Sequence, residues 1–447
     1  MKSYFLRRLL LIPPTLLGIT LLVFTVTRFV PGGPLERILQ QAAQASEKGS
    51  SGRSASNAQG GLNEEQLEEL EEQFGLDKTT LVAYGQWLGV VPREVRISKG
   101  EYGIDPGEKI GEDIDIEKIA PVVLKGDGRM VHVKRSGDTV ESAIFVKTGK
   151  PIASENWKVR FESEADRQAR YLRRNTGATT KPNYSPRAVV YQSNFAGLLQ
   201  GDFGRSMVYN DPVLEMIMDR IPVAFYFGLL TAIITYSVSL PLGVLKALKH
   251  RTFIDSASSV FIFIGYSIPG FALGAILLVH LGARANYFPL FGLTSANFGQ
   301  LDRWSQIKDI AHHTVLPLIC YVISGFAMLT MLTKNNLMDN LASDYVRTAI
   351  AKGISFRGAV FRHAFRNSMI PVATSVGGLI TIFVSGSMLI ETVFDIQGFG
   401  LLEYHSVIER DVPVIMGTLT IATFLILLGN VISDLTVALV DPRIKFE

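Results

Sequence analysis

Residues 344–371, DYVRTAIAKGISFRGAVFRHAFRNSMIP, lie between two long apolar segments and show the spacing of two short helices separated by a glycine. Ser343 is placed to cap the first helix and Ser355 the second, because a serine hydroxyl accepts a hydrogen bond from the backbone at a helix start. Gly353 is the residue that most easily takes the left-handed conformation that ends a helix. The pattern predicts a structured helix–glycine–helix loop.

Each predicted helix carries an apolar stripe and leaves its charges on another face. Val346, Ala349 and Ile350 share one face of the first helix. The stripe of the second helix consists of Val360, Phe361, Ala364 and Phe365. One acid, Asp344, accompanies five basic residues, which are Arg347, Lys352, Arg357, Arg362 and Arg366. A short basic loop of this kind is expected to bind a partner.

Six apolar stretches are long enough to cross about 30 Å of hydrocarbon, which takes about twenty helical residues. They are approximately Leu9–Val30, Val223–Leu245, Ser258–Leu281, Thr314–Thr333, Val372–Glu391 and Ile415–Val437. The first is followed by no small-residue cleavage site and is expected to be retained as a helix. The 447 residues are 47% hydrophobic and 19% charged, which indicates membrane spans joined to soluble segments.

Lysine and arginine are concentrated on one side of these spans. About fourteen lie in the two termini, the loop after the second span and the segment 334–371. The two short loops on the other side hold only Arg284, Arg303, Lys308 and Arg410. The positive-inside bias places both termini and the 334–371 loop in the cytoplasm.

Three kinds of partner suit a basic helix pair. A DNA-binding helix-turn-helix needs open space around its recognition helix, but the flanking segments enter the bilayer almost at once, which excludes a duplex. Two alternatives remain open from these residues alone. The helices can lie on lipid headgroups, or one helix can insert into a groove on a cytosolic protein.

The pattern Tyr345-Val346-Arg347-Thr348-Ala349-x-Ala351-Lys352-Gly353, followed by Arg362-His363-Ala364-x-Arg366-Asn367 and Pro371, resembles the coupling loop of permease subunits in bacterial binding-protein-dependent ABC importers, dipeptide and oligopeptide branch. In that family a short helix ending near the glycine sits in a cleft of the ATP-hydrolysing subunit. The resemblance therefore implies an ATPase-coupling loop consisting of Asp344, Tyr345, Arg347, Ala349, Ala351, Lys352, Gly353, Arg362 and Arg366.

Further motifs extend the resemblance over most of the chain. They are Tyr4-x-x-Arg7-Arg8, Pro31-Gly32-Gly33-Pro34, Gly398-Phe399-Gly400, Arg410-Asp411-x-Pro413-Val414 and Asp441-Pro442-Arg443-Ile444. The chain is most similar to the oligopeptide and microcin C permease type. The resemblance implies a type I ABC importer permease.

The long segment between the first two spans changes character at about residue 91. An acidic helix is expected after Asn63, and from 91 to 190 the pattern becomes alternating. Met130–Lys134, Thr139–Lys147 and Trp157–Phe161 are predicted strands of a β-rich extracytoplasmic domain. The residues 74–78 before it and 201–206 after it resemble family motifs that a short stretch normally separates. The domain is thus expected to be an insertion, which either is a tolerated decoration or docks the substrate-binding protein.

Small residues interrupt two of the predicted spans. Ser267, Pro269 and Gly270 break the third span, as a packing kink or as a hinge that lines the pathway. Ser385 and Gly386 belong to a small-residue set in the fifth span that suits a subunit interface or a channel lining. The ionisable residues of the spans are expected near their ends: Arg28 and Glu391 outside, where they can snorkel, and Asp434 inside.

Motifs for catalysis or cofactor binding are missing from the sequence. The only Gly-Lys pair, Gly149-Lys150, precedes Pro151, so the chain has no P-loop for ATP. The seven histidines show no metal-ligand spacing. We predict no catalytic, cofactor or metal site, and we expect ATP to be used by partner subunits. A membrane-anchored enzyme would have to place its chemistry in the 91–190 domain.

The expected architecture is an all-α polytopic membrane protein with six transmembrane helices and one inserted β-rich domain. The expected parts are a transmembrane helix (1–30), a linker with an acidic helix (31–90), the insertion (91–190), an interfacial segment (191–222) and a five-helix permease core (223–447).

The expected function is that of the permease subunit of an ATP-driven peptide importer in a bacterial inner membrane. Its expected partners are a second permease subunit in a heterodimer, two ATP-binding cassette ATPases, an extracytoplasmic binding protein and the lipid bilayer, with no nucleic acid. The alternatives are a permease for a non-peptide solute, such as a nickel chelate or an oligosaccharide, and a secondary transporter, which often shows inverted repeats.

Overall fold

The computed structural model describes residues 2–29, 64–73, 75–104, 117–174 and 182–440. The motifs expected at 31–34 and 441–444 lie outside these ranges, as does Phe74. The chain forms two compact units, one made of Met1–Pro34 with Gly204–Glu447 and the other of Leu35–Phe203.

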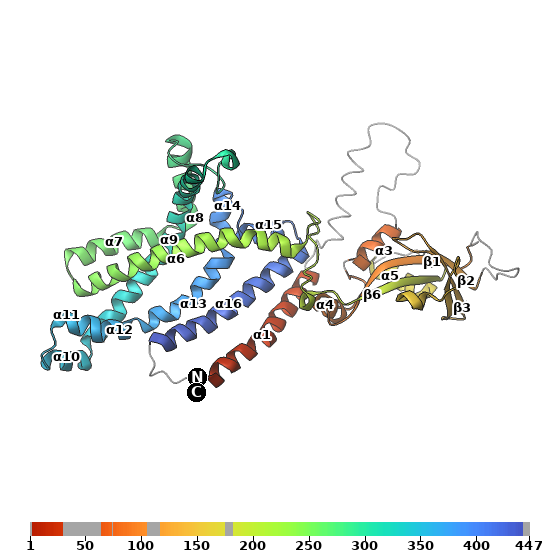
Figure 1. Ribbon diagram of the computed structural model, residues 1–447, viewed down its shortest axis with the longest axis horizontal. Helices are drawn as coiled ribbons and strands as arrows, with labels where there is room; N and C mark the ends of the chain where they lie inside the picture. The colour runs from red at the N-terminus through yellow and green to blue at the C-terminus, as the bar shows by residue number, and fades with distance from the viewer. Residues whose placement is uncertain (1, 30–63, 74, 105–116, 175–181, 441–447) are drawn as a thin grey trace. The chain divides into compact units, whose positions relative to one another are not determined.

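The first unit is helical (Figure 1). Its main helices are α1 (Lys2–Phe29), α6 (Val213–Leu248), α7 (Phe253–Ser267), α8 (Gly270–Leu277), α9 (Arg303–Ala342), α13 (Ile370–Ser385), α14 (Met388–Phe394), α15 (Phe399–Ile408) and α16 (Val412–Val440). Helix α6 packs along α9, and α16 packs along both α13 and α1. Apolar contacts between α6, α9 and α14 form a buried cluster that includes Phe227, Leu316 and Phe394.

Three helices of the described residues, α1, α6 and α16, are each long and apolar enough to cross a membrane. Two bent pairs raise this number to five if each pair counts as one span. One pair consists of the two halves of α9, which meet at 43°. The other consists of α7 and the segment Gly270–Arg284, which meet at 89°. The third predicted span is therefore not one straight helix.

The 89° bend lies at the predicted interruption. Helix α7 ends at Ser267, and Ile268 takes an extended conformation (φ −94°, ψ 118°). Pro269 favours this conformation in the residue before it and offers no N–H to continue the helix. Gly270 then starts α8 in a buried position. The break is thus sharper than a packing kink within one helix.

The fifth predicted span, Val372–Glu391, is also interrupted, so the prediction of a continuous helix there is wrong. Helix α13 ends at Ser385, Gly386 has a positive φ of 58°, and α14 starts at Met388. Glycine is the residue that takes such a φ at little cost. The interruption brings α14 against α8 and α15.

The second unit contains two three-stranded antiparallel sheets. One sheet has the order β1 (Arg93–Glu101), β6 (Arg187–Asn194), β5 (Trp157–Glu162), and the other β2 (Ile119–Val123), β3 (Met130–Ser136), β4 (Thr139–Phe145). The three strands predicted from alternation are confirmed as β3, β4 and β5. Their inward side chains, among them Val131 and Trp157, form one core with residues of the other strands.

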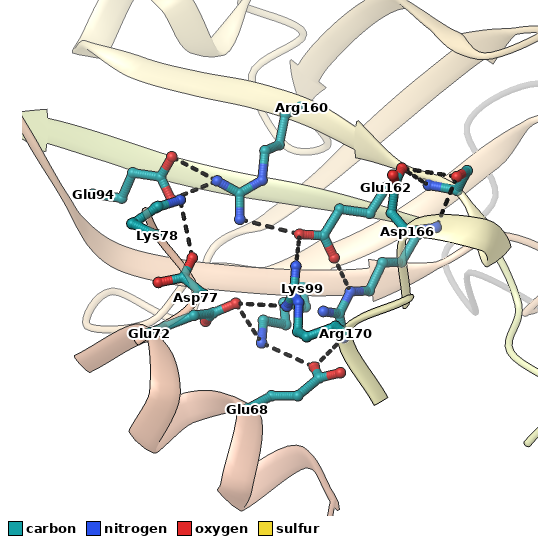
Figure 2. Close-up of polar contacts among 12 residues, drawn as sticks. Glu68, Glu72, Asp77, Lys78, Glu94, Lys99, Arg160, Glu162, Asp166 and Arg170 are labelled. Atoms are coloured by element: carbon teal, nitrogen blue, oxygen red, sulfur yellow. Dashed lines mark hydrogen bonds and ion pairs between the residues drawn. The ribbon is translucent and has the colours of Figure 1, made fainter. Parts of the chain in front are cut away.

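An ion-pair network attaches the acidic helix α3 (Glu64–Gln73) to the first sheet (Figure 2). Arg187 of β6 is only 3% exposed and donates to Glu68 of α3 at 2.6 Å and to Glu162 of β5 at 2.7 Å. Lys99 of β1 contacts both Glu68 and Glu72, at 3.3 and 3.0 Å. Helix α3 is therefore held to the strands by buried charge pairs as part of the same unit.

The charges around Glu162 set its protonation. Burial alone would raise the pKa of the Glu162 carboxyl, but the charges and hydrogen bonds of Arg187 and Arg170 outweigh burial and lower the pKa to about 2. Glu72 differs, because burial raises its pKa more than Lys99 and Arg170 lower it. Ionised Glu162 therefore stabilises the unit, whereas ionisation of Glu72 opposes folding.

We predict that this unit loses stability below about pH 4.5, because the pKa of Glu162 is lower in the folded state than its usual value of 4.5. The contribution is about 3 kcal/mol, is fully present above pH 4.5 and is lost as the pH falls toward 2. Glu162→Gln should remove it, lowering stability at pH 7 and flattening the profile between pH 5 and pH 3.

The measurement is unfolding of the full chain with Trp304→Phe, which leaves Trp87 and Trp157 of the second unit as emitters. Glu155→Gln is the matched control, since Glu155 forms an exposed pair with Arg129. An unchanged acid slope in Glu162→Gln would show that other groups cause the acid loss.

Candidate functional site

The predicted loop folds as a short helix followed by a second, irregular helical segment. Helix α10 covers Asp344–Ala351, and α11 (Phe356–Ala359), the π-helical turn η5 (Val360–Ala364) and α12 (Phe365–Ser368) follow. The predicted cap of the second segment is confirmed, because the Ser355 hydroxyl accepts from Gly358 N at 3.3 Å. The predicted side-chain cap of α10 is wrong. Ser343 occupies the N-cap position, but its hydroxyl donates to the carbonyl of Asp339.

Gly353 ends α10 as predicted, with a positive φ of 89°. The two hydrogen bonds of a Schellman motif surround it: Gly353 N donates to Ile350 O at 2.9 Å, and Ile354 N donates to Ala349 O at 3.2 Å. Ile354 also packs against the apolar cluster beneath α10, the contact that usually accompanies this motif. The direction in which the chain leaves α10 is therefore fixed at Gly353.

The inner face of α10 consists of Val346 and Ala349, which are 1% and 7% exposed. Val346 packs with Val244 of α6 and Leu337 of α9. Ala349, predicted as part of the docking surface, is thus buried against the protein's own helices. Ile350, predicted on the same inner face, is 42% exposed, because the inner face of this short helix is only two residues wide.

The outer face combines positive charge with apolar side chains. The other predicted coupling residues are all exposed, namely Asp344, Tyr345, Arg347, Ala351, Lys352, Gly353, Arg362 and Arg366. Ile350, Phe356 and Phe361 are 42%, 59% and 55% exposed among them. Arg347 makes only a loose pair with Asp344, at 3.7 Å. We call this exposed set the α10–α12 surface. Exposed apolar side chains and exposed basic side chains thus share one face of the loop.

A charged cluster that sequence reasoning missed joins the helices from which this surface projects. Lys246 near the end of α6 is 0% exposed and lies 3.0 Å from Asp255 Oδ1 at the start of α7. Lys334 of α9 donates to both oxygens of the same carboxylate, at 2.7 and 2.9 Å. Lys246 also donates to the hydroxyls of Ser258 and Ser259. One carboxylate therefore balances two buried lysines from two different helices.

The sequence offered little signal for this cluster. Both Lys246 and Lys334 were expected in cytoplasmic loops, and Lys334 was the first residue of the predicted 334–371 loop. In the structure α9 continues to Ala342, so Lys334 lies inside the helix. Asp255 gave no signal of its own, because acidic residues are common in the first turn of any helix.

A second buried carboxylate lies at the break between α13 and α14. Glu391, predicted to snorkel at an external end, is 1% exposed, so that prediction is wrong. It accepts from Leu401 N at 2.7 Å, Ser387 N at 3.1 Å and Tyr321 Oη at 3.1 Å. A Cβ at Gly386 would lie 1.9 Å from the carboxylate. Gly386 is therefore needed for the close approach of Glu391, which caps the start of α15 and ties it to α9.

The predicted hinge residues lie in different environments in the structure. Ser267 and Pro269 are exposed at the bend after α7, and the Ser267 hydroxyl donates to Phe263 O. Gly270 is buried at the start of α8, which packs on α14. Ser385 is the last residue of α13, and its side chain lies outside the described part. The segments on either side of the bend, α7 and α8, both pack on α9, whose Tyr321 donates to Glu391.

Two of the motifs noted in the sequence contact each other. Asp411 is 1% exposed and accepts from the Ser206 hydroxyl, from Met207 N at 3.1 Å and from Val208 N at 3.4 Å. Ser206 closes the 201–206 motif and Asp411 belongs to the 410–414 motif. The contact fastens the segment before α6 to the start of α16.

The described residues contain no group of three or more His, Cys, Asp or Glu that could hold a metal ion. Residues 239–446, which include α7 to α16 and the α10–α12 surface, match the family model of the binding-protein-dependent transport system inner membrane component. The chain belongs to this family of ABC permeases, which are membrane-embedded transport subunits that work with ATPase and substrate-binding partners.

Named relatives match over different lengths. The chain is 34% identical to the inner membrane ABC transporter permease protein YejB of Escherichia coli O157:H7 over 451 residues, all of both chains. It is 31% identical to the peptidoglycan transport system permease protein YejB of Agrobacterium fabrum over 467 residues, covering 100% of this chain and 99% of the relative. It is 38% identical to the oligopeptide transport system permease protein AppB of Bacillus subtilis over 262 residues, covering 58% of this chain and 81% of AppB.

We predict that Asp255→Asn destabilises the helical unit by about 3–5 kcal/mol, because it leaves two buried lysines without a counter-charge. Lys334→Met should lower the free energy of unfolding much less, because Asp255 still forms its ion pair with Lys246 at 3.0 Å. The check is the thermal unfolding midpoint of the purified protein in detergent. A larger loss in Lys334→Met than in Asp255→Asn would contradict the assignment of Asp255 as the shared counter-ion.

Proposed function

We propose that this chain is a permease subunit of an ATP-driven importer of peptides. The full-length similarity to two YejB permeases and the 38% identity to an oligopeptide permease support this substrate class. In the proposed complex the chain pairs with a second, similar permease subunit, and two ATPase subunits bind on the cytoplasmic side. An extracytoplasmic binding protein delivers the peptide.

The α10–α12 surface is proposed as the docking site for an ATPase subunit. The observation that carries this proposal is the combination of Gly353, which fixes the end of α10, with an outer face that is basic and apolar at once. Loose basic side chains alone would serve equally well on lipid headgroups. Exposed Phe356 and Phe361 on a conformationally fixed helix pair favour a shaped protein groove instead.

Movement of the ATPases would reach the spans through direct contacts. Val346 on the inner face of α10 packs on α6 and α9, and Asp255 holds the same two helices to α7. A displacement of α10 is therefore transmitted to three helices together. The protein acts as a two-state switch between outward-open and inward-open forms, biased by nucleotide bound to the partner.

We propose that both termini and the α10–α12 surface face the cytoplasm, that six spans cross the membrane and that the β-rich unit is an extracytoplasmic insertion. The distribution of lysine and arginine supports the orientation. The AppB match supports extra length in this chain, because 42% of the chain lies outside an alignment that covers 81% of AppB.

We predict that Gly353→Val lowers ATP-driven peptide uptake by about 5- to 30-fold, since a non-glycine residue at positive φ costs about 1–2 kcal/mol. A Cβ at Gly353 meets no atom within 4 Å, so the cost lies in the backbone and the protein should still insert. Gly353→Asn is the matched control, because asparagine tolerates positive φ better, and it should keep most of the uptake.

The measurement is vanadate-sensitive uptake by proteoliposomes that contain the whole transporter, with co-purification of the ATPase subunits as a second readout. Normal uptake and normal ATPase binding in Gly353→Val would contradict the coupling role. Uptake that needs no ATP in any variant would instead indicate a secondary transporter.

A further inference from the structure

A cleft in the helical unit takes no part in the contacts proposed above. It lies between the first turns of α6, the helix α15, the start of α16 and the segment just before α6, and its volume is about 590 Å³. All of its lining residues belong to one compact unit. Ligand sites in proteins usually have volumes of about 300–1,000 Å³, so a short peptide or a part of one fits.

Hydrogen bonds hold the walls of this cleft in place. Tyr209 Oη donates to Glu409 Oε1 at 3.1 Å, which ties the segment before α6 to the end of α15. Arg220 of α6 donates to the side-chain oxygen of Gln397, just before α15. The contacts of Asp411 described above fasten the same segment to the start of α16. The cleft is therefore preformed, as ligand sites usually are.

Negative charge predominates in the lining of the cleft. Four carboxylates line it together with one guanidinium and one imidazole, and these side chains are Asp211, Asp219, Glu409 and Asp411, then Arg220 and His405. Asp411 is buried and Glu409 is half-buried, but Asp211 and Asp219 are exposed. Two carboxylates therefore reach the solvent in a cleft whose excess of negative charge attracts a cation.

The rest of the lining indicates which kind of cation fits. Met216 and Val223 of α6 and Leu401 and Leu402 of α15 line the same cleft, so its acidic side chains adjoin apolar ones. In the part of the chain that the structure describes, no three His, Cys, Asp or Glu side chains are grouped as metal ligands. An organic ammonium next to an apolar side chain matches both features of the lining. The amino end of a peptide has this chemistry.

We propose that this cleft binds the amino end of a peptide, with the ammonium group at the exposed carboxylates Asp211 and Asp219 and the first apolar side chain against Met216 and Leu402. The inference rests on the proposed function, which supplies the peptide and places this end of α6 on the extracytoplasmic side. Every unmodified peptide carries the same ammonium group, so a site of this kind accepts many sequences.

The test measures the heat of binding of the tripeptide Leu-Leu-Ala to the full chain in phosphatidylcholine nanodiscs, without ATPase subunits or binding protein. Acetylation of the peptide's amino group should weaken binding at least about tenfold, because hydrogen bonds from a charged donor are lost. Asp211→Asn and Asp219→Asn should each weaken it about two- to fivefold, as expected for exposed charge pairs. Glu215→Gln is the matched control and should bind normally, since Glu215 is exposed one turn earlier on α6 and does not line the cleft.

A second measurement locates the ligand. The same tripeptide with a photoreactive benzoylphenylalanine in its first position should cross-link to Met216 or Leu402, and the unfolding midpoint verifies that each variant is folded. Equal affinities of the free and acetylated peptides, cross-links confined to other residues, or no saturable binding at millimolar peptide would each overturn the proposal. So would displacement of the peptide by phosphatidylethanolamine, which would assign the cleft to a lipid ammonium group. ATP-driven uptake is measured separately in proteoliposomes, so a failure of the transport function is distinguished from a failure of the cleft to bind.

Discussion

A buried lysine is tolerated in a helical membrane protein only when a counter-charge lies within hydrogen-bonding distance, and Lys246 and Lys334 share one. The shared carboxylate, Asp255, belongs to a third helix. Because both lysines need the same group, α6, α7 and α9 cannot separate at this end without exposing a bare charge to apolar surroundings. The α10–α12 surface is built on the ends of two of these helices, so a push on it meets a rigid support.

The buried Glu391 carboxylate is stabilised in a different way. No cation faces this carboxylate in the described contacts; backbone N–H groups and the Tyr321 hydroxyl surround it instead. Such donors can be exchanged one at a time as helices shift, whereas an ion pair between lysine and aspartate resists separation. The helical unit thus combines a firm joint near α10 with a more adjustable one at the start of α15. That combination suits a protein in which one end receives a force and the other end opens.

Local backbone signals in the sequence were more reliable than long-range ones, although the side-chain cap predicted at Ser343 was wrong. Gly353 and Ser355 could be assigned because a helix end has few chemical solutions, and strands β3 to β5 could be assigned because their side chains alternate. Contacts between residues that are far apart in the sequence could not be predicted. Asp255 and Lys334 are 79 positions apart, and nothing in either neighbourhood of the sequence indicates the other. The environment of Glu391 was predicted wrongly because α13 and α14 form one continuous apolar stretch in the sequence. Gly386 breaks the helix between them.

The second unit buries some of its charged residues and exposes some of its apolar ones. Its buried ion pairs join Glu68, Glu162 and Arg187 and hold α3 on the sheet, whereas the pairs Arg129–Glu155 and Lys134–Glu141 lie at the surface. Exposed apolar side chains include Leu81 on α4 (Thr80–Leu88), Leu199 on the turn η2 (Leu198–Gln200) and Val123 on β2. The second unit is therefore held together by two kinds of contact, the apolar core that includes Val131 and Trp157 and the buried ion pairs of Arg187.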